Sequence, residues 1–186
     1  MPPGCLSTLW DNEAGLRDTY LKRFPGYYLT GDGGYIDDDG YLYIMGRIDD
    51  VIIVSGHNIS SGSIEEVLAS HRDVAECAVF GVKDPLKTQV PLALVVLKAN
   101  VEREHATIKR ELIELVRREV GPVANLKQVG IVARLPKTRS GKVMRSTMRK
   151  IANAEAYQVP PTIEDPAVLG DITAALRELG YPAGGT

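Results

Sequence analysis

The chain is poor in several residue types on which whole classes of protein depend. It has two cysteines, Cys5 and Cys77, too few and too poorly spaced for a disulfide framework or a metal site. It has no apolar run near the roughly 18 residues that a membrane-spanning helix needs. No aromatic residue lies between Gly121 and Ala156, where cations are frequent. These shortages argue against a disulfide-rich domain, a membrane-spanning protein and a surface that stacks nucleic-acid bases.

Acidic residues are missing from one long stretch of a chain that is slightly acidic as a whole. The formal net charge is -2, yet no Asp or Glu lies between Glu119 and Glu155. The cations in this gap are Lys127, Arg134, Lys137, Arg139, Lys142, Arg145, Arg149 and Lys150. Such local segregation of charge fits a compact polyanion such as a polyphosphate. A solvated cationic face is the plain alternative, and a nucleic-acid patch is a third.

The segment Leu135–Lys142, LPKTRSGK, lies inside this cationic stretch. Pro136 and Gly141 indicate a loop, and the following residues have the spacing of a helix. We therefore expect Lys142 at a junction between a loop and a helix. The segment is not a nucleotide-binding P-loop, because no glycine lies five residues before Gly141 and Val143 stands where Ser or Thr is needed.

Two further motifs lie upstream, YLTGDGG at Tyr28–Gly34 and GRIDDVIIVSGHN at Gly46–Asn58. Asp32, between two glycines, offers two acceptor oxygens that suit a sugar diol. Arg47 offers a planar fork of donors that suits phosphate or ribose oxygens. Read without their context, Asp32 would be a local turn residue and Arg47 a surface ion-pair partner of the acidic pair that follows it.

In this order and at these spacings, TGD, GRIDDVIIVSGHNIS and PKTRSGK resemble the last three core motifs of the acyl-adenylate-forming superfamily. LPKTRSGKVMR and the late TIEDP are similar to the short-chain acyl-CoA synthetases, first the propionyl-CoA and then the acetyl-CoA branch. The resemblance implies a ligase that activates propionate or acetate with ATP to acyl-AMP and passes the acyl group to CoA, releasing AMP. It implies Mg²⁺ for the full enzyme, and we assign no metal ligands in this chain.

The resemblance also implies roles for individual residues. Lys142 matches the catalytic lysine, which stabilises negative charge as the α-phosphate of ATP reacts. Asp32 and Arg47 match ATP-binding positions. Asp49 matches the hinge about which the small domain moves between the two half-reactions; its plain alternative is an ordinary turn carboxylate.

Three residues match positions that contact CoA in the resembling enzymes. Ser55 and Gly56 match a backbone segment that approaches the pantetheine thiol, where a side chain would obstruct the ligand. Arg117 matches an arginine that faces a CoA phosphate, with a solvated helix face as the alternative. Asn58 departs from the acetate-specific pattern, which usually has an arginine, and this puts one ATP contact in doubt.

The chain of 186 residues is long enough for one domain with a good core but is much shorter than the enzymes it resembles. We expect a C-terminal piece: residues 1–48 as the end of the large AMP-binding domain, and residues 49–186 as the mobile domain with the catalytic lysine. By itself such a piece should be inactive. A non-catalytic regulatory or interaction module that kept the fold is the alternative function.

The expected fold class is α+β, a small mixed sheet with helices packed on one face, after a short β-rich remnant of the large domain. We expect strands at 74–82, 90–98 and 128–133, and a helix at 106–120. A capping box at Ser63–Glu66 predicts a second helix, and Asp165 as N-cap predicts a third. The three histidines, His57, His71 and His105, show no metal-ligand spacing. The expected location is the cytoplasm, with no nucleic-acid or membrane partner, and Lys142 is a candidate for acylating and deacylating enzymes.

Overall fold

The computed structural model describes residues 4–182, apart from the side chain of Met45. The chain divides into two compact units, Met1–Asp49 and Asp50–Thr186, here called unit 1 and unit 2. The division falls one residue after the boundary expected between residues 48 and 49. The ends of the two expected segments, residues 1–3 and 183–186, lie outside the described residues.

Unit 1 holds little secondary structure and almost no core. It consists of the short helix α1 (Glu13–Leu16), a π-helical turn (Arg17–Leu21), and strands β1 (Asp32–Ile36) and β2 (Leu42–Arg47), which pair antiparallel. Tyr35 and Tyr43 stack across the two strands with ring centroids 5.0 Å apart, yet both stay exposed. Among its described residues, only Leu16 is buried. A two-stranded ribbon of this kind is marginal on its own.

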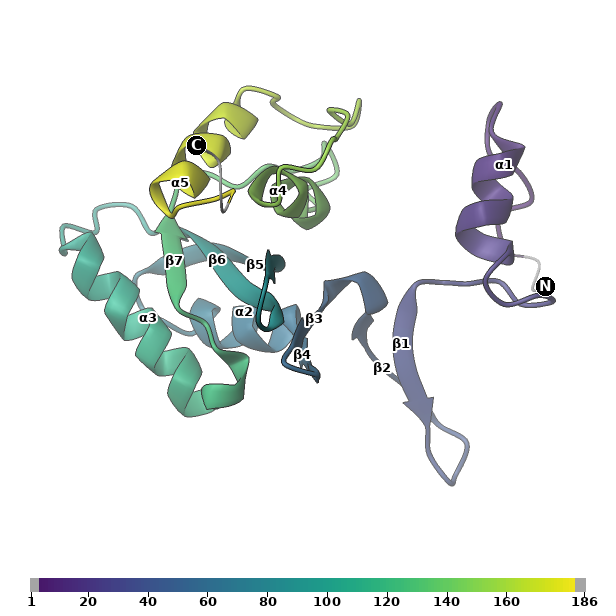
Figure 1. Cartoon of the computed structure of the whole chain (residues 1–186), viewed down its shortest axis with the longest axis horizontal. Coiled ribbons are helices and arrows are strands. Elements are labelled where there is room, and N and C mark those ends of the chain that lie inside the picture. Colours follow the sequence, from purple (N-terminus) through teal and green to yellow (C-terminus); the bar gives the residue numbers. More distant parts are fainter. Residues whose placement is uncertain (1–3, 183–186) are drawn as a thin grey trace. The chain divides into compact units, whose positions relative to one another are not determined.

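Unit 2 is built on a five-stranded mixed sheet, which confirms the predicted α+β class. Its strands are β3 (Val51–Val54), β4 (His57–Ser60), β5 (Val74–Asp84), β6 (Thr88–Leu97) and β7 (Gln128–Ile131). The order is β4-β3-β6-β5, and β7 also pairs with β6 (Figure 1). Only the β6–β7 pair is parallel among the described strands. Strand β6 is therefore the centre of the sheet.

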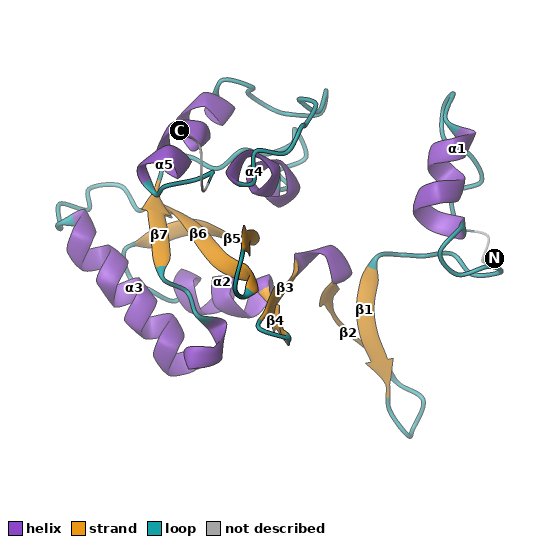
Figure 2. Cartoon of the chain, viewed as in Figure 1, coloured by secondary structure: helices purple, strands orange, loops and turns teal. Residues whose placement is uncertain are grey.

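Helices cover both faces of this sheet, as Figure 2 shows. Helices α2 (Ser61–Ala69) and α3 (His105–Glu119) pack on one face, and α4 (Arg145–Ala152) and α5 (Val168–Glu178) on the other. Alternate residues of β6 enter different cores: Ala93 belongs to the α2–α3 core and Leu94 to the α4–α5 core. The expectation of helices on one face was wrong, because β5 and β6 are apolar on both faces and need two covering layers.

Strand and helix positions otherwise follow the sequence pattern closely. The expected strands 74–82, 90–98 and 128–133 correspond to β5, β6 and β7, and the expected helix 106–120 corresponds to α3. Three residues of the α3 stripe, Ile108, Leu112 and Val116, are almost fully buried. Apolar periodicity thus located the central elements correctly and missed only their terminal residues.

Two helix starts differ from the capping patterns that predicted them. Helix α2 begins two residues before Ser63, whose hydroxyl donates to the Ser60 carbonyl and so does not form the expected capping box. Helix α5 begins three residues after Asp165, with a turn at 166–167 between them. The Asp165 carboxylate nevertheless accepts a hydrogen bond from the Ala167 N–H, as an N-cap residue does. Gly180 ends α5 as expected, with a φ of 83°.

Candidate active site

Lys142 is held in a tight loop, here called the lysine loop (Leu135–Val143), between β7 and α4. Its backbone is bonded on both sides: the Lys142 N–H donates to the Thr138 hydroxyl at 3.1 Å, and the Lys142 carbonyl accepts from the Thr138 N–H at 2.9 Å. Gly141 completes the turn with a φ of 81°, which favours glycine. The Lys142 side chain is exposed. The structure thus fixes the backbone and leaves the ammonium group free to reach a ligand.

The lysine loop is also joined to the segment before α5. The Arg139 N–H donates to the Thr162 carbonyl and the Glu164 N–H donates to the Lys137 carbonyl, both at 2.9 Å. On the other side of the loop, the Met144 N–H donates to the Pro136 carbonyl at 2.9 Å. Because these bonds join backbone atoms, the loop keeps its shape whatever its exposed side chains do.

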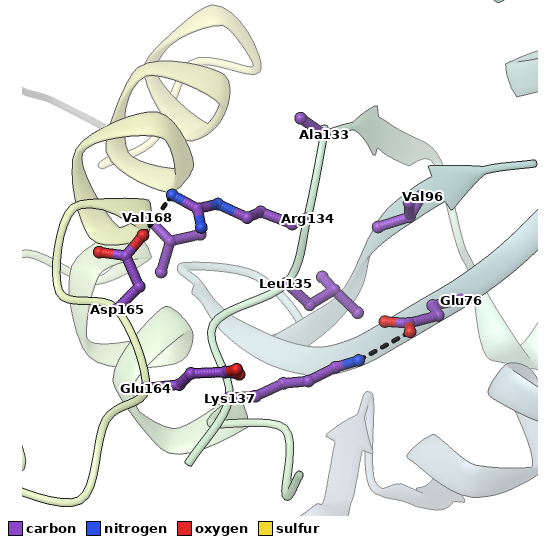
Figure 3. A pocket seen from close by; sticks show the side chains of 9 residues that line it. All are labelled: Glu76, Val96, Ala133, Arg134, Leu135, Lys137, Glu164, Asp165 and Val168. Carbon is purple, nitrogen blue, oxygen red and sulfur yellow. Dashed lines mark hydrogen bonds and ion pairs between the residues drawn. The ribbon is translucent and has the colours of Figure 1, made fainter. Parts of the chain in front are cut away.

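Several of the cations around Lys142 are neutralised by ion pairs. Figure 3 shows two of these pairs beside a pocket of about 340 Å³. The pairs are Lys137–Glu76 at 2.7 Å and Arg134–Asp165 at 2.6 Å in this pocket, and Arg145–Glu65 at 2.7 Å elsewhere. Within residues 4–182, Lys142 and Arg139 form no ion pair. The cationic stretch therefore presents a few uncompensated charges and not a continuous field.

In unit 1, Arg47 brings together the two carboxylates that the motifs single out. Its Nη1 lies 3.4 Å from Asp32 Oδ1, and its Nε donates to Asp49 Oδ1 at 3.1 Å. It also donates to the Thr30 carbonyl at 3.0 Å. Gly31 has a φ of 84°, and a Cβ there would meet the Arg47 guanidinium at 2.7 Å. The glycine of the TGD motif thus leaves room for the arginine that holds Asp32 and Asp49.

Ser55 and Gly56 form the two-residue turn between β3 and β4, which the sequence reading missed. Val54 pairs with His57 across it, and φ is 49° at Ser55 and 85° at Gly56. Two consecutive positive φ values are typical of a type I′ hairpin turn, and Ser-Gly directly after an apolar run was the available signal. A Cβ on Gly56 would meet nothing within 4 Å. Here the backbone conformation, more than crowding, favours glycine.

Arg117 is exposed near the end of α3, at the edge of a cavity of about 380 Å³. Lys127 contributes a second cation to the lining, and Leu126 contributes an apolar wall. Asn125, which has a left-handed φ of 53°, also lines the cavity, and its amide nitrogen is buried without a partner among the described residues. The cavity can accept an anionic group with an apolar neighbour, in keeping with the role that the sequence suggests for Arg117.

Sequence spacing missed a charged cluster around His71. The ligand atoms of His71, Asp73 and Glu111 all lie within 4.8 Å of one another. Arg103 occupies this cluster: it donates to Asp73 at 2.6 Å and to both oxygens of Glu111 at 2.6 and 2.9 Å. The hydrogen bonds from Arg103 to Glu111, and to a smaller extent the bond from the His71 ring, lower the pKa of Glu111 to about 2. The guanidinium supplies the positive charge that a metal ion would otherwise bring, so the cluster acts as a structural ion-pair network.

One family model matches a segment that includes most of the lysine loop. The matching family model is described as the AMP-binding enzyme C-terminal domain, and its match covers residues 63–142, ending at Lys142. Residues 63–142 are an AMP-binding enzyme C-terminal domain. This AMP-binding C-terminal domain comprises most of α2, the whole of β5, β6, α3 and β7, and most of the lysine loop.

Several relatives of the chain are named as short-chain acyl-CoA synthetases. It is 50% identical over 178 residues to acyl-CoA synthetase short-chain family member 3, mitochondrial, of Mus musculus, covering 96% of this chain and 26% of the relative. It is 55% identical over 177 residues to an uncharacterized protein of Pseudomonas aeruginosa, covering 95% of this chain and 28% of the relative. The chain thus spans little more than a quarter of the length of these relatives.

Solved structures share the fold of the AMP-binding C-terminal domain and of adjoining parts of the chain. An ATP-bound RpMatB-BxBclM chimera superposes with a TM-score of 0.67 and 28% identity, over 81% of this chain and 29% of the chimera. ATP-bound MatB from Rhodopseudomonas palustris gives a TM-score of 0.60 and 26% identity, over 72% of this chain and 25% of that one. Across residues 4–182, no helix combines the length and apolar character needed to cross a membrane.

Proposed function

We propose that the chain is the lysine-bearing C-terminal part of an AMP-forming short-chain acyl-CoA synthetase. The observation that carries this proposal is Lys142: its backbone is fixed by Thr138, its side chain is exposed, and no ion pair in residues 4–182 neutralises it, although cations nearby are paired. A binding module without catalysis would have no need of such an arrangement. The names of the relatives agree with this choice.

In the first half-reaction, the substrate carboxylate attacks the α-phosphorus of ATP, acyl-AMP forms and pyrophosphate leaves. Negative charge shifts onto the phosphate oxygens as the bond breaks. The Lys142 ammonium, placed at these oxygens, stabilises the transition state more than the bound substrate and so speeds the step. Asp32 would accept the ribose hydroxyls, and Arg47 would turn part of its donor fork to ribose or phosphate. Mg²⁺ is expected to accompany ATP, with ligands outside those assigned here.

In the second half-reaction, the CoA thiol attacks the acyl carbonyl and AMP leaves. Rotation at Asp49 would move the small domain so that Lys142 withdraws and the Ser55–Gly56 turn approaches the thiol arm. Arg117 would bind a CoA phosphate at its cavity. This division assigns one face of the small domain to each half-reaction.

Unit 1 is best explained as the end of a large AMP-binding domain. Its exposed apolar residues include Trp10, Tyr27, Tyr41 and Ile44, and among its described residues only Leu16 is buried. Such a unit needs a larger body to cover it. The phosphate-binding loop and the acyl pocket would belong to that body, so we expect the chain alone to form neither acyl-AMP nor acyl-CoA.

The acid remains a choice between propionate and acetate, with propionate preferred on the motifs. One relative is named acetyl-coenzyme A synthetase 2, from Zygosaccharomyces bailii, and is 46% identical over 181 residues. The cytoplasm is kept as the proposed location, although the Mus musculus relative is named mitochondrial. Lys142, being exposed, is also accessible to enzymes that acylate and deacylate lysine, and loss of its charge would stop the first half-reaction.

The test compares Lys142→Ala with Arg139→Ala in the complete enzyme that carries this chain. Loss of one preorganised charge at a developing anion lowers the rate by on the order of 10²–10³. Acyl-AMP formation, followed by pyrophosphate release with propionate and with acetate, should fall by this amount in Lys142→Ala only. Thioester formation from supplied acyl-AMP should persist. Arg139 is the matched control, because it is exposed on the same loop; an equal loss there would favour a general cationic field.

A further inference from the structure

Glu65 lies where three elements of unit 2 meet. From α2, its Oε1 accepts a hydrogen bond from the Val79 N–H of β5 at 2.7 Å. The Arg145 side chain, at the first residue of α4, donates to Oε1 through Nε and to Oε2 through Nη2, both at 2.7 Å. The side chains of Glu65 and Arg145 are only 16% and 29% exposed. A two-pronged charged contact with so little water around it fixes both orientation and distance.

This contact fixes α4 along an otherwise open strand edge. Strand β5 pairs only with β6 among the described strands, so backbone groups on its other edge need partners. Glu65 satisfies the Val79 N–H, and the Asn153 side chain, just after α4, accepts from the Lys83 N–H at 2.9 Å. Helix α4 is therefore attached to the same edge of β5 at both of its ends.

The attachment at Arg145 is close to the proposed catalytic residue. Arg145 follows Lys142 by three residues, and between them the Met144 N–H is bonded to the Pro136 carbonyl. Any shift of the start of α4 must therefore be passed to the lysine loop. The Glu65 hydrogen bond is also the main cause of the raised pKa of Arg145, to which the Asp50 carboxylate contributes. The Arg145 guanidinium thus stays charged through the pH range in which an enzyme works.

We propose that Glu65 is a positioning residue for Lys142, acting through Arg145. Glu65 touches no substrate in this scheme; it sets where α4 begins and hence where the Lys142 ammonium can reach. This inference rests on the proposed function, since it concerns the step that Lys142 performs. Displacement of a catalytic group by about 1 Å can lower a rate by on the order of 10²-fold.

The decisive variant is Glu65→Gln in the complete enzyme. The amide oxygen can still accept from the Val79 N–H, whereas the charged two-pronged contact with Arg145 is lost. We expect kcat for acyl-AMP formation to fall by on the order of 10- to 100-fold with little change in the KM for ATP. Thioester formation from supplied acyl-AMP should be spared. Glu155→Gln is the matched control, because it removes one partner of the Lys83–Glu155 pair at 2.7 Å, away from the lysine loop.

A double variant separates positioning from general support of the fold. If Glu65 acts through Lys142, then Glu65→Gln should cause no further loss of acyl-AMP formation in a Lys142→Ala background. A loss of the same size in that background, or equal losses in both half-reactions, would overturn the inference. So would an unchanged rate in Glu65→Gln.

Two arrangements keep the test decisive. If Glu65→Gln does not fold, Arg145→Lys, which keeps the charge but not the planar fork, is subjected to the same comparisons and decides by the same outcomes. If the unmodified complete enzyme forms no acyl-AMP with any short carboxylate, the proposed function itself fails. That result is distinct from an active enzyme in which Glu65→Gln behaves like the unmodified protein.

Discussion

At the scale of single residues, the surroundings of a charge decide its role more than its place in a cationic stretch. Arg139 and Arg145 are equivalent in sequence, as cations flanking Lys142. In the structure Arg139 is exposed, whereas Arg145 is held by Glu65. The motif singles out Lys142, but the sequence could not show that Arg145 is bound by another side chain. Glu65 and Arg145 are 80 residues apart, and only folding brings them together.

Gly56 permits a test of backbone conformation against ligand access. Gly56→Ala should lower the free energy of unfolding by about 1–2 kcal/mol, because alanine disfavours the φ of 85°. Gly56→Asn should leave stability nearly unchanged, since asparagine tolerates this conformation. If the thiol arm of CoA can bind only where no side chain projects, Gly56→Asn will slow thioester formation while the urea midpoint of unfolding stays constant. An asparagine variant with full thioester activity would assign Gly56 to the turn alone.

At the scale of elements, α3 is fixed to the rest of unit 2 by charge as well as by its apolar stripe. Glu111 on α3 accepts hydrogen bonds from Arg103 in the preceding loop. Its Oε2 also lies 3.1 Å from Nε2 of His71, which follows α2. The Asp73 N–H donates to His71 Nδ1, so in the neutral ring Nε2 carries the hydrogen that Glu111 accepts. This network joins the segment after α2 to the middle of α3, two helices that cover one face of the sheet.

The network predicts how stability depends on pH. Arg103, and then His71, lowers the pKa of Glu111 from its ordinary 4.5 to about 2. A carboxyl with a lowered pKa in the folded state stabilises above its unfolded pKa and ceases to do so as pH falls through the folded value. The difference in unfolding free energy between the unmodified chain and Glu111→Gln should thus be constant above pH 4.5 and shrink towards pH 2. Urea titrations at several pH values measure it.

Glu114→Gln is the matched control for this experiment. Glu114 is exposed on the same helix and has no ion pair within the described part of the chain. Its substitution should leave the pH dependence of unfolding almost as it is in the unmodified chain. A difference for Glu111→Gln that stays the same from pH 7 to pH 2 would show that Arg103 does not hold the carboxylate as the geometry indicates.

The sequence predicted helices and strands well where a single apolar period marked one buried face. It predicted less well where a strand is apolar on both faces or where a polar side chain bonds to a nearby backbone group. The apolar stripe of α3 located that helix to within one residue at each end. Strands β5 and β6 were located to within two residues at each end, but their near-continuous apolar runs do not show which helices cover each face. The start of α2 was misplaced because the Ser63 hydroxyl bonds to the Ser60 carbonyl and not to N–H groups of the helix. Asp165 does accept from the Ala167 N–H, but α5 begins only after a turn at 166–167.

At the scale of the whole molecule, the division between Asp49 and Asp50 coincides with the expected hinge to within one residue. The motif order predicted two parts, and the assignment of these parts to two domains stays a prediction. A single sequence contains no direct measure of where contacts become sparse. The roles of Asp32, Arg47 and Asp49 stay predictions. The Arg47–Asp49 ion pair is the alternative that the sequence offered for Arg47, whereas the Arg47–Asp32 contact is one that the spacing of the two motifs did not reveal.

Asp49→Pro tests the hinge in the complete enzyme. Proline fixes φ and would restrict the backbone rotation that carries the small domain between half-reactions. One half-reaction, measured as acyl-AMP formation or as thioester formation from supplied acyl-AMP, should survive much better than the other. Asp49→Ala is the control, since it removes the carboxylate bonded to Arg47 but keeps the rotation. Small and equal losses in both half-reactions of Asp49→Pro would remove Asp49 from this role.

The lysine loop keeps its shape without using the side chain on which the proposed chemistry depends. Its bonds come from backbone atoms and from the Thr138 hydroxyl, while the Lys142 ammonium is exposed. A neutral cap on that nitrogen would thus silence a molecule without unfolding it, and removal of the cap would restore it in full. Each molecule would be either on or off, so the output of a population would fall in direct proportion to the capped fraction. The cell could then adjust flux through the number of uncapped molecules, without synthesis or degradation of the protein.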